Sequence, residues 1–302
     1  GLGDVYKRQA GPSGMQFALT ASARGHVVTL IEREKVLGGK VVPGSRPKIK
    51  FDFKNYLDYL IREVRLAEEK GGIILQTGVE ADTQWLKEQN FDAIVYNIGT
   101  TSVVPRIPGV DQADWVQATD LLCEPEKLGD ARRTVVIGGG VVGCETAYWL
   151  KYEKGCDVTV VEMLPYIMSG ACTANRYHLI HYMEKAGVKL LNCAKVTGFT
   201  KDSVQIEKNI SKGVPDPYNT WQPQLPENIA NPLAKKIGPE TEVQELPADL
   251  VVFAMGGRPD ESLYLEGLRM HAAKELYNIG DSFAGGRVLE AARAAYRLAR
   301  DI

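Results

Sequence analysis

The chain has 302 residues, of which 44% are apolar and 25% are charged, with a net charge of −2 and a pI near 6.2. This length exceeds what one hydrophobic core usually serves, so we expect two domains. The weak net charge and scattered basic residues argue against nucleic acid and anionic membrane surfaces as partners. The chain contains no apolar run near the roughly 20 residues that cross a bilayer and no secretory signal pattern, which predicts a cytoplasmic protein.

The predicted elements form an internal repeat of a glycine-rich loop, a helix and an apolar strand. The first copy has its helix at 15–23 and its strand at 26–32, and the second has them at 144–154 and 156–162. β-Branched runs of this kind are typical of buried strands. Further strands are expected at 73–76, 93–97, 134–137, 188–191, 204–207, 250–255 and 276–279. Strands that alternate with helices predict an α/β fold with two doubly wound parallel sheets of Rossmann type.

Two stretches with prolines, 103–110 and 245–257, are interpreted as crossings between domains, and the second repeat lies between them. We therefore expect a discontinuous first domain, 1–107 with 256–302, and an inserted second domain, 108–255. Within the second domain, seven of the protein's 15 prolines fall in 209–247. Proline disfavours helix interiors and central strands, so this segment is expected to be an irregular excursion. A docking surface for a partner domain is the functional alternative.

The second glycine-rich loop carries the clearest motif, Gly138-Gly139-Gly140-Val141-Val142-Gly143, between an apolar strand and a helix. Gly138 permits the tight turn, Gly140 lets a pyrophosphate approach the helix N-terminus, and Gly143 lets helix and strand pack closely. Glu162 ends the next strand, where a carboxylate accepts hydrogen bonds from ribose hydroxyls and repels a 2′-phosphate. The motif predicts NAD binding, with NADH preferred over NADPH because Met163, rather than an arginine, follows Glu162.

The first glycine-rich loop is an incomplete version of the same motif. Gly11 and Gly14 occupy the second and third glycine positions, whereas Gln9 occupies the first. Glu32 is placed to bind ribose hydroxyls, and Arg33 follows it at the adenine end.

The segment before this loop, 4–9, is mostly polar, which is unusual for a central parallel strand. Its sequence can be back-translated into a transposon end used to fragment DNA for sequencing. We therefore expect residues 1–9 to be derived from a sequencing library, with the true first strand and everything upstream missing.

The far end of the chain supplies a piece that could complete the first site. An apolar strand ends at Gly280-Asp281 and is followed by a helix over about 287–300. A carboxylate at such a strand end can bind a flavin ribityl hydroxyl, and a helix N-terminus directed at a flavin favours the negative charge of its reduced ring. Both ends of the chain would then meet on one flavin nucleotide.

The ordered set of motifs resembles the two-dinucleotide-binding-domain flavoproteins, over essentially the whole chain after Gln9. Segments 92–100 and 249–259, which contain Gly99 and Gly256, are similar to the two strand-then-glycine crossings of that family. Gly38-Gly39-Lys40 and 287–293 are similar to the carboxy-terminal half of 2-enoate and 2,4-dienoyl-CoA reductases. The resemblance implies FAD in the first domain, NAD in the second, and Gly39 and Lys40 near the flavin.

The resemblance also implies partners and an electron path. The similar reductases carry an FMN barrel and an iron–sulfur cluster upstream, so electrons would pass from NADH through FAD, the cluster and FMN to an activated carbon–carbon double bond. Two alternatives stay open. One is a non-catalytic module that holds ADP, resembling that of trimethylamine dehydrogenase, and the other is a free-standing NADH-dependent reductase of a separate electron carrier.

Other chemistries find little support in the sequence. The five cysteines contain no close pair, so dithiol chemistry is not expected. His178 and His181 are three residues apart on one helix face without a recognisable third ligand, so no metal site is predicted. Hydride transfer between nicotinamide and flavin needs no protein nucleophile, because the reactive atoms belong to the cofactors. No catalytic residue is therefore assigned.

Overall fold

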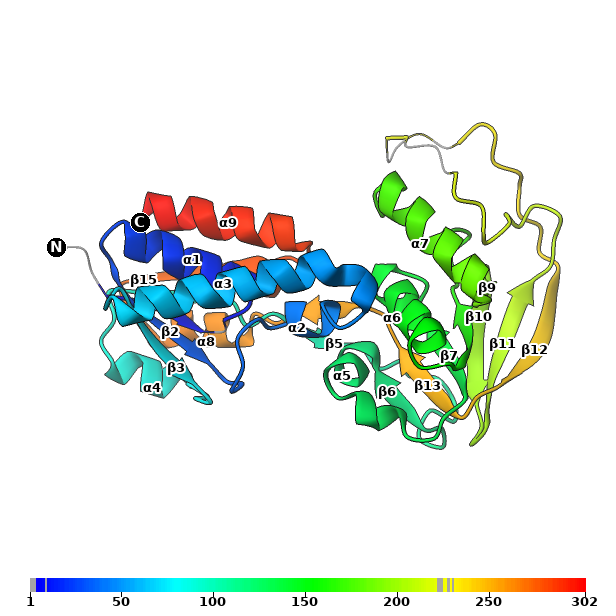
Figure 1. Ribbon diagram of the computed structural model, residues 1–302, viewed down its shortest axis with the longest axis horizontal. Coiled ribbons are helices and arrows are strands. Elements are labelled where there is room, and N and C mark those ends of the chain that lie inside the picture. Colours follow the sequence, from blue (N-terminus) through cyan, green and yellow to red (C-terminus); the bar gives the residue numbers. More distant parts are fainter. Residues whose placement is uncertain (1–3, 9, 222–224, 227–228, 230) are drawn as a thin grey trace. The chain divides into compact units, whose positions relative to one another are not determined.

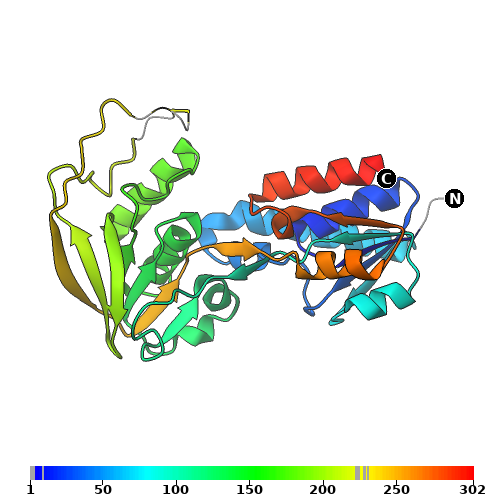
Figure 2. The ribbon, with the colours of Figure 1, turned by 180° about the vertical axis from the view of Figure 1, so that it is seen from behind.

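The computed structural model describes residues 4–8, 10–221, 225–226, 229 and 231–302. The chain divides into two compact units (Figures 1 and 2). The terminal unit comprises Gly1–Ser102 and Gly257–Ile302, and the inserted unit comprises Val103–Gly256. Each unit is built on a five-stranded parallel sheet, which confirms the predicted α/β fold class. No helix in the described part of the chain is both long enough and apolar enough to cross a membrane.

The sheet of the terminal unit has the strand order β15-β4-β1-β2-β3, with all neighbours parallel. Buried residues of α1, α3 and α9 pack on one face, and those of α4 and α8 form a separate core on the other (Figure 1). The bounds are β1 Asp4–Arg8, α1 Pro12–Ala23, β2 Val27–Glu32, α2 Val41–Gly44, α3 Phe51–Glu69, β3 Ile73–Thr77, α4 Thr83–Glu88, β4 Ala93–Tyr96, β5 Thr100–Ser102, β14 Gly257–Pro259, α8 Ser262–Met270, β15 Glu275–Asn278 and α9 Val288–Asp301.

The central strand β1 differs from the expectation for a polar segment. Asp4–Arg8 pairs in parallel with both β2 and β4, in the position that the composition argued against. A parallel ladder uses main-chain N–H and C=O groups, which every residue except proline supplies in full, so polar side chains do not prevent the pairing. The library origin of residues 1–9 stays a prediction.

The sheet of the inserted unit has the order β6-β13-β7-β8-β9, again with all neighbours parallel. The helices of this unit include α6, which follows the glycine-rich loop, and α7, which packs beside it. The bounds are β6 Trp115–Gln117, α5 Ala118–Cys123, β7 Arg133–Ile137, α6 Val141–Tyr152, β8 Asp157–Val161, α7 Thr173–Ala186, β9 Lys189–Leu191, β10 Ala194–Phe199, β11 Ser203–Asn209, β12 Thr241–Pro247 and β13 Leu250–Phe253.

A second, antiparallel sheet in this unit, with the order β10-β11-β12, was not expected from the sequence (Figure 2). Its inward residues, such as Phe199 and Ile206, share one buried cluster with Val135 and Phe253 of the parallel sheet. The prediction that 209–247 lacks regular structure is wrong for Thr241–Pro247, which forms β12. Its proline is tolerated because Pro247 ends a strand at the edge of the sheet.

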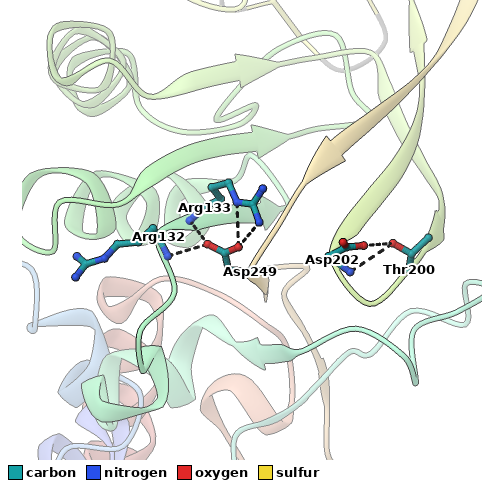
Figure 3. A network of polar contacts seen from close by, with 5 residues as sticks. All are labelled: Arg132, Arg133, Thr200, Asp202 and Asp249. Carbon is teal, nitrogen blue, oxygen red and sulfur yellow. Dashed lines mark hydrogen bonds and ion pairs between the residues drawn. The ribbon is translucent and has the colours of Figure 1, made fainter.

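At the amino ends of β7 and β13, Asp249 joins the two strands (Figure 3). Its Oδ1 accepts a hydrogen bond from Arg133 Nε at 2.9 Å, and its Oδ2 accepts from the main-chain N–H groups of Arg132 and Arg133 at 3.0 and 2.8 Å. The Arg133 guanidinium and these N–H groups hold the pKa of Asp249 well below its usual range. Nearby, Thr200 donates to Asp202 at 3.2 Å in the turn between β10 and β11.

Candidate dinucleotide-binding sites

Each glycine-rich loop lies at the switch point of its parallel sheet, which is the place where the strand order reverses. In the terminal unit the loop runs from β1 to α1, and in the inserted unit it runs from β7 to α6. The strands across the switch point are β4 and β13, and the predicted residues Gly99 and Gly256 follow them. In open α/β sheets, ligands bind in the crevice outside the strand ends at this point.

The second loop is shaped by two close approaches. Gly138 has a φ of 110°, and a Cβ added there would lie 2.5 Å from the carbonyl oxygen of Ala254. A Cβ on Gly143 would collide with the carbonyl oxygen of Gly138. These two positions therefore require glycine for the loop to fit between β7 and β13.

The helix N-termini at Gly140 and Gly11 have the features of anion sites. Each glycine is the N-cap of its helix, in extended conformation, and has no side chain that could cap the first N–H groups. In α1, Pro12 has no N–H and Gly14 N donates to Asn97. No acidic residue lies in the first turn of either helix. A Cβ added at either glycine would meet no described atom within 4 Å, so the space in front of the loop is open. This space and these donors fit the pyrophosphate of a dinucleotide.

Glu32 is tied to the first loop by its own carboxylate. The side chain is 3% exposed, and Oε2 accepts from Ala10 N at 2.7 Å while Oε1 accepts from Glu34 N at 2.9 Å. The carbonyl oxygen of Ala10 in turn accepts from Gly38 N at 2.8 Å. A carboxylate offers about four lone-pair directions, so Glu32 keeps capacity for a ribose hydroxyl.

Glu162 repeats this arrangement in the inserted unit. Its Oε2 accepts from Gly139 N at 2.7 Å, its Oε1 accepts from Leu164 N at 2.8 Å, and Met168 N donates to the carbonyl oxygen of Gly139 at 2.7 Å. Glu162 is only half-buried, and Met163 beside it is 67% exposed. The acid therefore fixes its loop in both units, a role that the sequence motif alone does not reveal.

A hollow of about 670 Å³ in the terminal unit has a size typical of ligand pockets, which range over roughly 300–1,000 Å³. Its lining includes Arg33, Glu80, Thr100 and Arg269. Arg33, predicted at the adenine end, therefore lines a polar cavity as well as pairing with Glu34 at 3.1 Å.

Three polar residues that each follow a glycine meet in the terminal unit. Lys40, Thr100 and Asp281 come directly after Gly39, Gly99 and Gly280, whose φ angles are 51°, 81° and 69°. Lys40 Nζ donates to Thr100 Oγ1. Burial lowers the pKa of Lys40, and the charge of Asp281 opposes that shift. The structure thus brings together two residues predicted near a flavin, and it adds Thr100, which the sequence reasoning missed.

Asn97 is a second residue that was missed. It is 6% exposed at the end of β4. In the amide orientation that satisfies both neighbours, it donates to the carbonyl oxygen of Ile279 at 3.1 Å and accepts from Gly14 N at 3.1 Å. It links the first glycine-rich loop to the segment that leads to Asp281. The available signal was a polar residue directly after an apolar strand.

His178 and His181 lie on α7, whereas Cys144 contacts the second glycine-rich loop. On α7, His178 is exposed and His181 is half-buried, and the ring of His181 stacks on Tyr177 with a centroid distance of 6.0 Å. The described residues contain no group of three potential metal ligands. Cys144, Cys156 and Cys193 are free thiols, and burial raises the pKa of the Cys144 thiol well above its usual range. Cys144 Sγ donates to Gly139 O at 3.5 Å, which gives it a structural contact.

Comparison with known families gives these loops their context. The family model described as pyridine nucleotide-disulphide oxidoreductase matches residues 10–277. The chain belongs to this family. Membership implies a flavin and a nicotinamide nucleotide as cofactors, and the oxidoreductase resemblance predicted from the motifs is confirmed.

Two proteins that are similar to this chain are longer than it. An NADH oxidase of Thermoanaerobacter brockii is 29% identical over 299 residues, covering 97% of this chain and 40% of that protein. A cinnamate reductase of Clostridium sporogenes is 31% identical over 296 residues, covering 97% of this chain and 38% of that protein.

Among solved structures, a 2-naphthoyl-CoA reductase in complex with 2-naphthoyl-CoA matches with a TM-score of 0.83 and 26% identity. The match covers 100% of this chain and 40% of that one. The chain therefore spans about two-fifths of the length of these relatives.

Proposed function

We propose that this chain is the NADH-oxidising module of a reductase that acts on activated carbon–carbon double bonds. The terminal unit binds FAD and the inserted unit binds NADH. Bound FAD supplies the acceptor for the hydride of NADH, and the protein binds and orients both nucleotides. The observation that carries this proposal is the pair of matching loops, each with open space in front of a helix N-terminus and a strand-end glutamate beside it.

The roles follow from position. Gly11 and Gly140 admit the two pyrophosphates, while Gly14, Gly138 and Gly143 keep the loops tight against their sheets. Glu32 and Glu162 bind the ribose hydroxyls as well as fixing the loops. In the terminal unit, Lys40 and Asp281 contact the flavin and its ribityl chain, and the turns at Gly39, Gly99, Gly256 and Gly280 shape the strand ends around the ligands.

NADH is preferred over NADPH in this proposal. The carboxylate of Glu162 would lie beside the 2′ position, where it accepts from a hydroxyl and repels a phosphate. The exposed neighbour Met163 offers no positive charge to compensate for that repulsion.

The electron acceptor lies in a separate part of the full protein. We place there an FMN and iron–sulfur domain that reduces an enoate or enoyl-CoA. Support comes from the relatives, one named a cinnamate reductase and another bound to 2-naphthoyl-CoA, each more than twice as long as this chain.

The test is an anaerobic titration of the chain reconstituted with FAD. We expect NADH to bleach the bound-flavin absorbance near one equivalent, with NADPH at least about 10-fold weaker, equivalent to about 1.4 kcal/mol. Bleaching by both nucleotides at equal concentrations would remove the NADH preference. Protein that binds ADP tightly but never retains FAD would contradict the redox role and favour a structural ADP-holding module.

A further inference from the structure

In the proline-rich excursion, residues 210–240, the first part is anchored to the inserted unit by specific hydrogen bonds. Tyr218 Oη donates to Val188 O at 2.9 Å and accepts from Leu190 N at 3.1 Å, at the edge strand β9. Its own turn is closed by Asp216, which accepts from Tyr218 N at 3.0 Å. The first part of the excursion, 211–220, is therefore a built element of this unit.

Two buried side chains then join the excursion to the loop that follows Glu162. Asn192, 1% exposed, donates from Nδ2 to Pro165 O at 2.7 Å and to Pro215 O at 2.8 Å. Residue 165 lies in the loop 163–168, and residue 215 lies in the excursion. One amide group thus bridges the two segments.

Arg176 makes the second bridge. This side chain on α7 is 2% exposed, and its guanidinium donates to three main-chain carbonyl oxygens, Ile167 at 2.8 Å, Thr220 at 2.6 Å and Asn219 at 2.7 Å. Burial lowers the pKa of Arg176, although arginine keeps its charge in proteins. A buried cation leaves a large desolvation penalty if its acceptors move away, so the three carbonyl groups and the guanidinium hold one another in place.

The loop 163–168 itself contacts the nucleotide motif. It begins at Glu162, whose carboxylate accepts from Gly139 N and Leu164 N, and it ends at Met168, whose N–H donates to Gly139 O. The side chain of Ile167 also lies against this turn, 3.0 Å from where a Cβ on Gly139 would be. An unbroken series of contacts therefore runs from the excursion to the glycine-rich loop.

We propose that Arg176 and Asn192 are positioning residues for the nicotinamide nucleotide, with 211–220 as the support against which they hold the loop 163–168. This inference rests on the proposed NADH site and deepens it. Its consequence is reciprocal: loosening the excursion weakens NADH binding, and NADH binding steadies the excursion.

The experiment combines NADH affinity with hydrogen exchange on the FAD-reconstituted chain. We expect Arg176→Met to raise the Kd for NADH roughly 2- to 30-fold, the range that coupling of 0.5–2 kcal/mol produces. Arg176→Lys should recover part of that loss because it restores a cation with fewer donors. Arg132→Met is the matched control, since the Arg132 side chain is exposed and points away from Asp249 (Figure 3). Its Kd should equal that of the unaltered chain.

Hydrogen exchange in the unaltered chain keeps the test independent of whether the Arg176 variants fold. NADH should slow exchange of the amides in 211–220 as well as those in 138–143 and 163–168. Slowing confined to 138–143 and 163–168 would overturn the inference while leaving the proposed function intact. If NADH changes neither the hydrogen exchange nor the fluorescence of the chain, NADH does not bind. That result would contradict both the proposed function and this inference.

Discussion

The two glycine-rich loops have the same main-chain frame but different supports. In both, a strand-end glutamate accepts from the N–H of a loop residue, Ala10 or Gly139, and that residue's carbonyl oxygen accepts from the N–H six positions beyond the glutamate. The sheets match as well, since β4-β1-β2-β3 corresponds to β13-β7-β8-β9.

The supports differ where each loop meets the strand across the switch point. Asn97 after β4 links Gly14 to Ile279, whereas Ala254 after β13 is a small residue packed close to Gly138 and Gly143. The fifth strand also differs, being β15 from the end of the chain in one sheet and β6 from before the motif in the other. The comparison teaches that the two loops share one main-chain frame, while the side chains around it adapt each copy to its own surroundings.

The largest expected effect separates the two loops by ligand. Gly140→Ala should abolish measurable NADH binding and leave FAD retention unchanged. Gly11→Ala should abolish FAD retention and leave NADH binding unchanged. In both variants the new methyl group enters the open space in front of one helix. Both backbones are extended, so neither variant should fold less stably. Losses below about 10-fold, or 1.4 kcal/mol, in equilibrium titrations would contradict the assignment of the loops.

The two glutamates should differ in their contribution to stability. Glu32→Gln should lower the free energy of unfolding by about 1.5–3 kcal/mol, because a buried charged acceptor of two N–H groups is replaced by an amide that can satisfy only one of them. Glu162→Gln is the matched variant at a half-buried position, and it should lower the free energy of unfolding by a smaller amount. Urea unfolding followed by circular dichroism measures both, and equal costs would mean that burial does not distinguish the two copies.

Asn97→Ala should have a smaller effect, about 1 kcal/mol, the usual contribution of a hydrogen bond. It removes the link between Gly14 and Ile279 and should also weaken FAD retention, whereas NADH binding in the inserted unit should not change. The fluorescence of flavin released on dilution measures FAD retention. Unchanged retention would show that Asn97 supports only the fold.

The smallest effect concerns the aspartates that precede β4 and β13. Asp249→Asn should lower Tm at pH 7, because Arg133 and two main-chain N–H groups depress the pKa of Asp249 in the folded state. Its stabilisation is present above the unfolded pKa of about 3.9 and is lost as the pH falls toward the lower folded pKa, so the difference in Tm should narrow progressively below about pH 4.

Asp92→Asn is the matched control for this pH dependence. Asp92 pairs with Lys274 at 3.0 Å, and the two side chains are 50% and 83% exposed. An exposed ion pair contributes little to stability, so the change in Tm should be smaller than for Asp249→Asn. Equal changes across the pH range would contradict the distinction between the two strand ends.

The sequence predicted the parallel strands and the second glycine motif because both depend on local patterns, apolar runs and glycine spacing. It did not predict the pairing of β1, since main-chain pairing does not require apolar side chains, and it was wrong at β12, where a proline at an edge strand is harmless. The antiparallel sheet was missed because β10 alternates buried and exposed residues and β12 is rich in glutamate and glutamine, so neither forms an apolar run.

By itself, the sequence determined the α/β class, the repeat of the glycine-rich loops and the acids that accompany them, since each is encoded within about thirty residues of chain, the length of a βαβ unit. Only the tertiary structure decided which distant residues support those loops. Asn97, Arg176 and Asn192 act through hydrogen bonds to main-chain groups far away in sequence. Such contacts place no demand on the identity of the acceptor residue, so no sequence pattern records them.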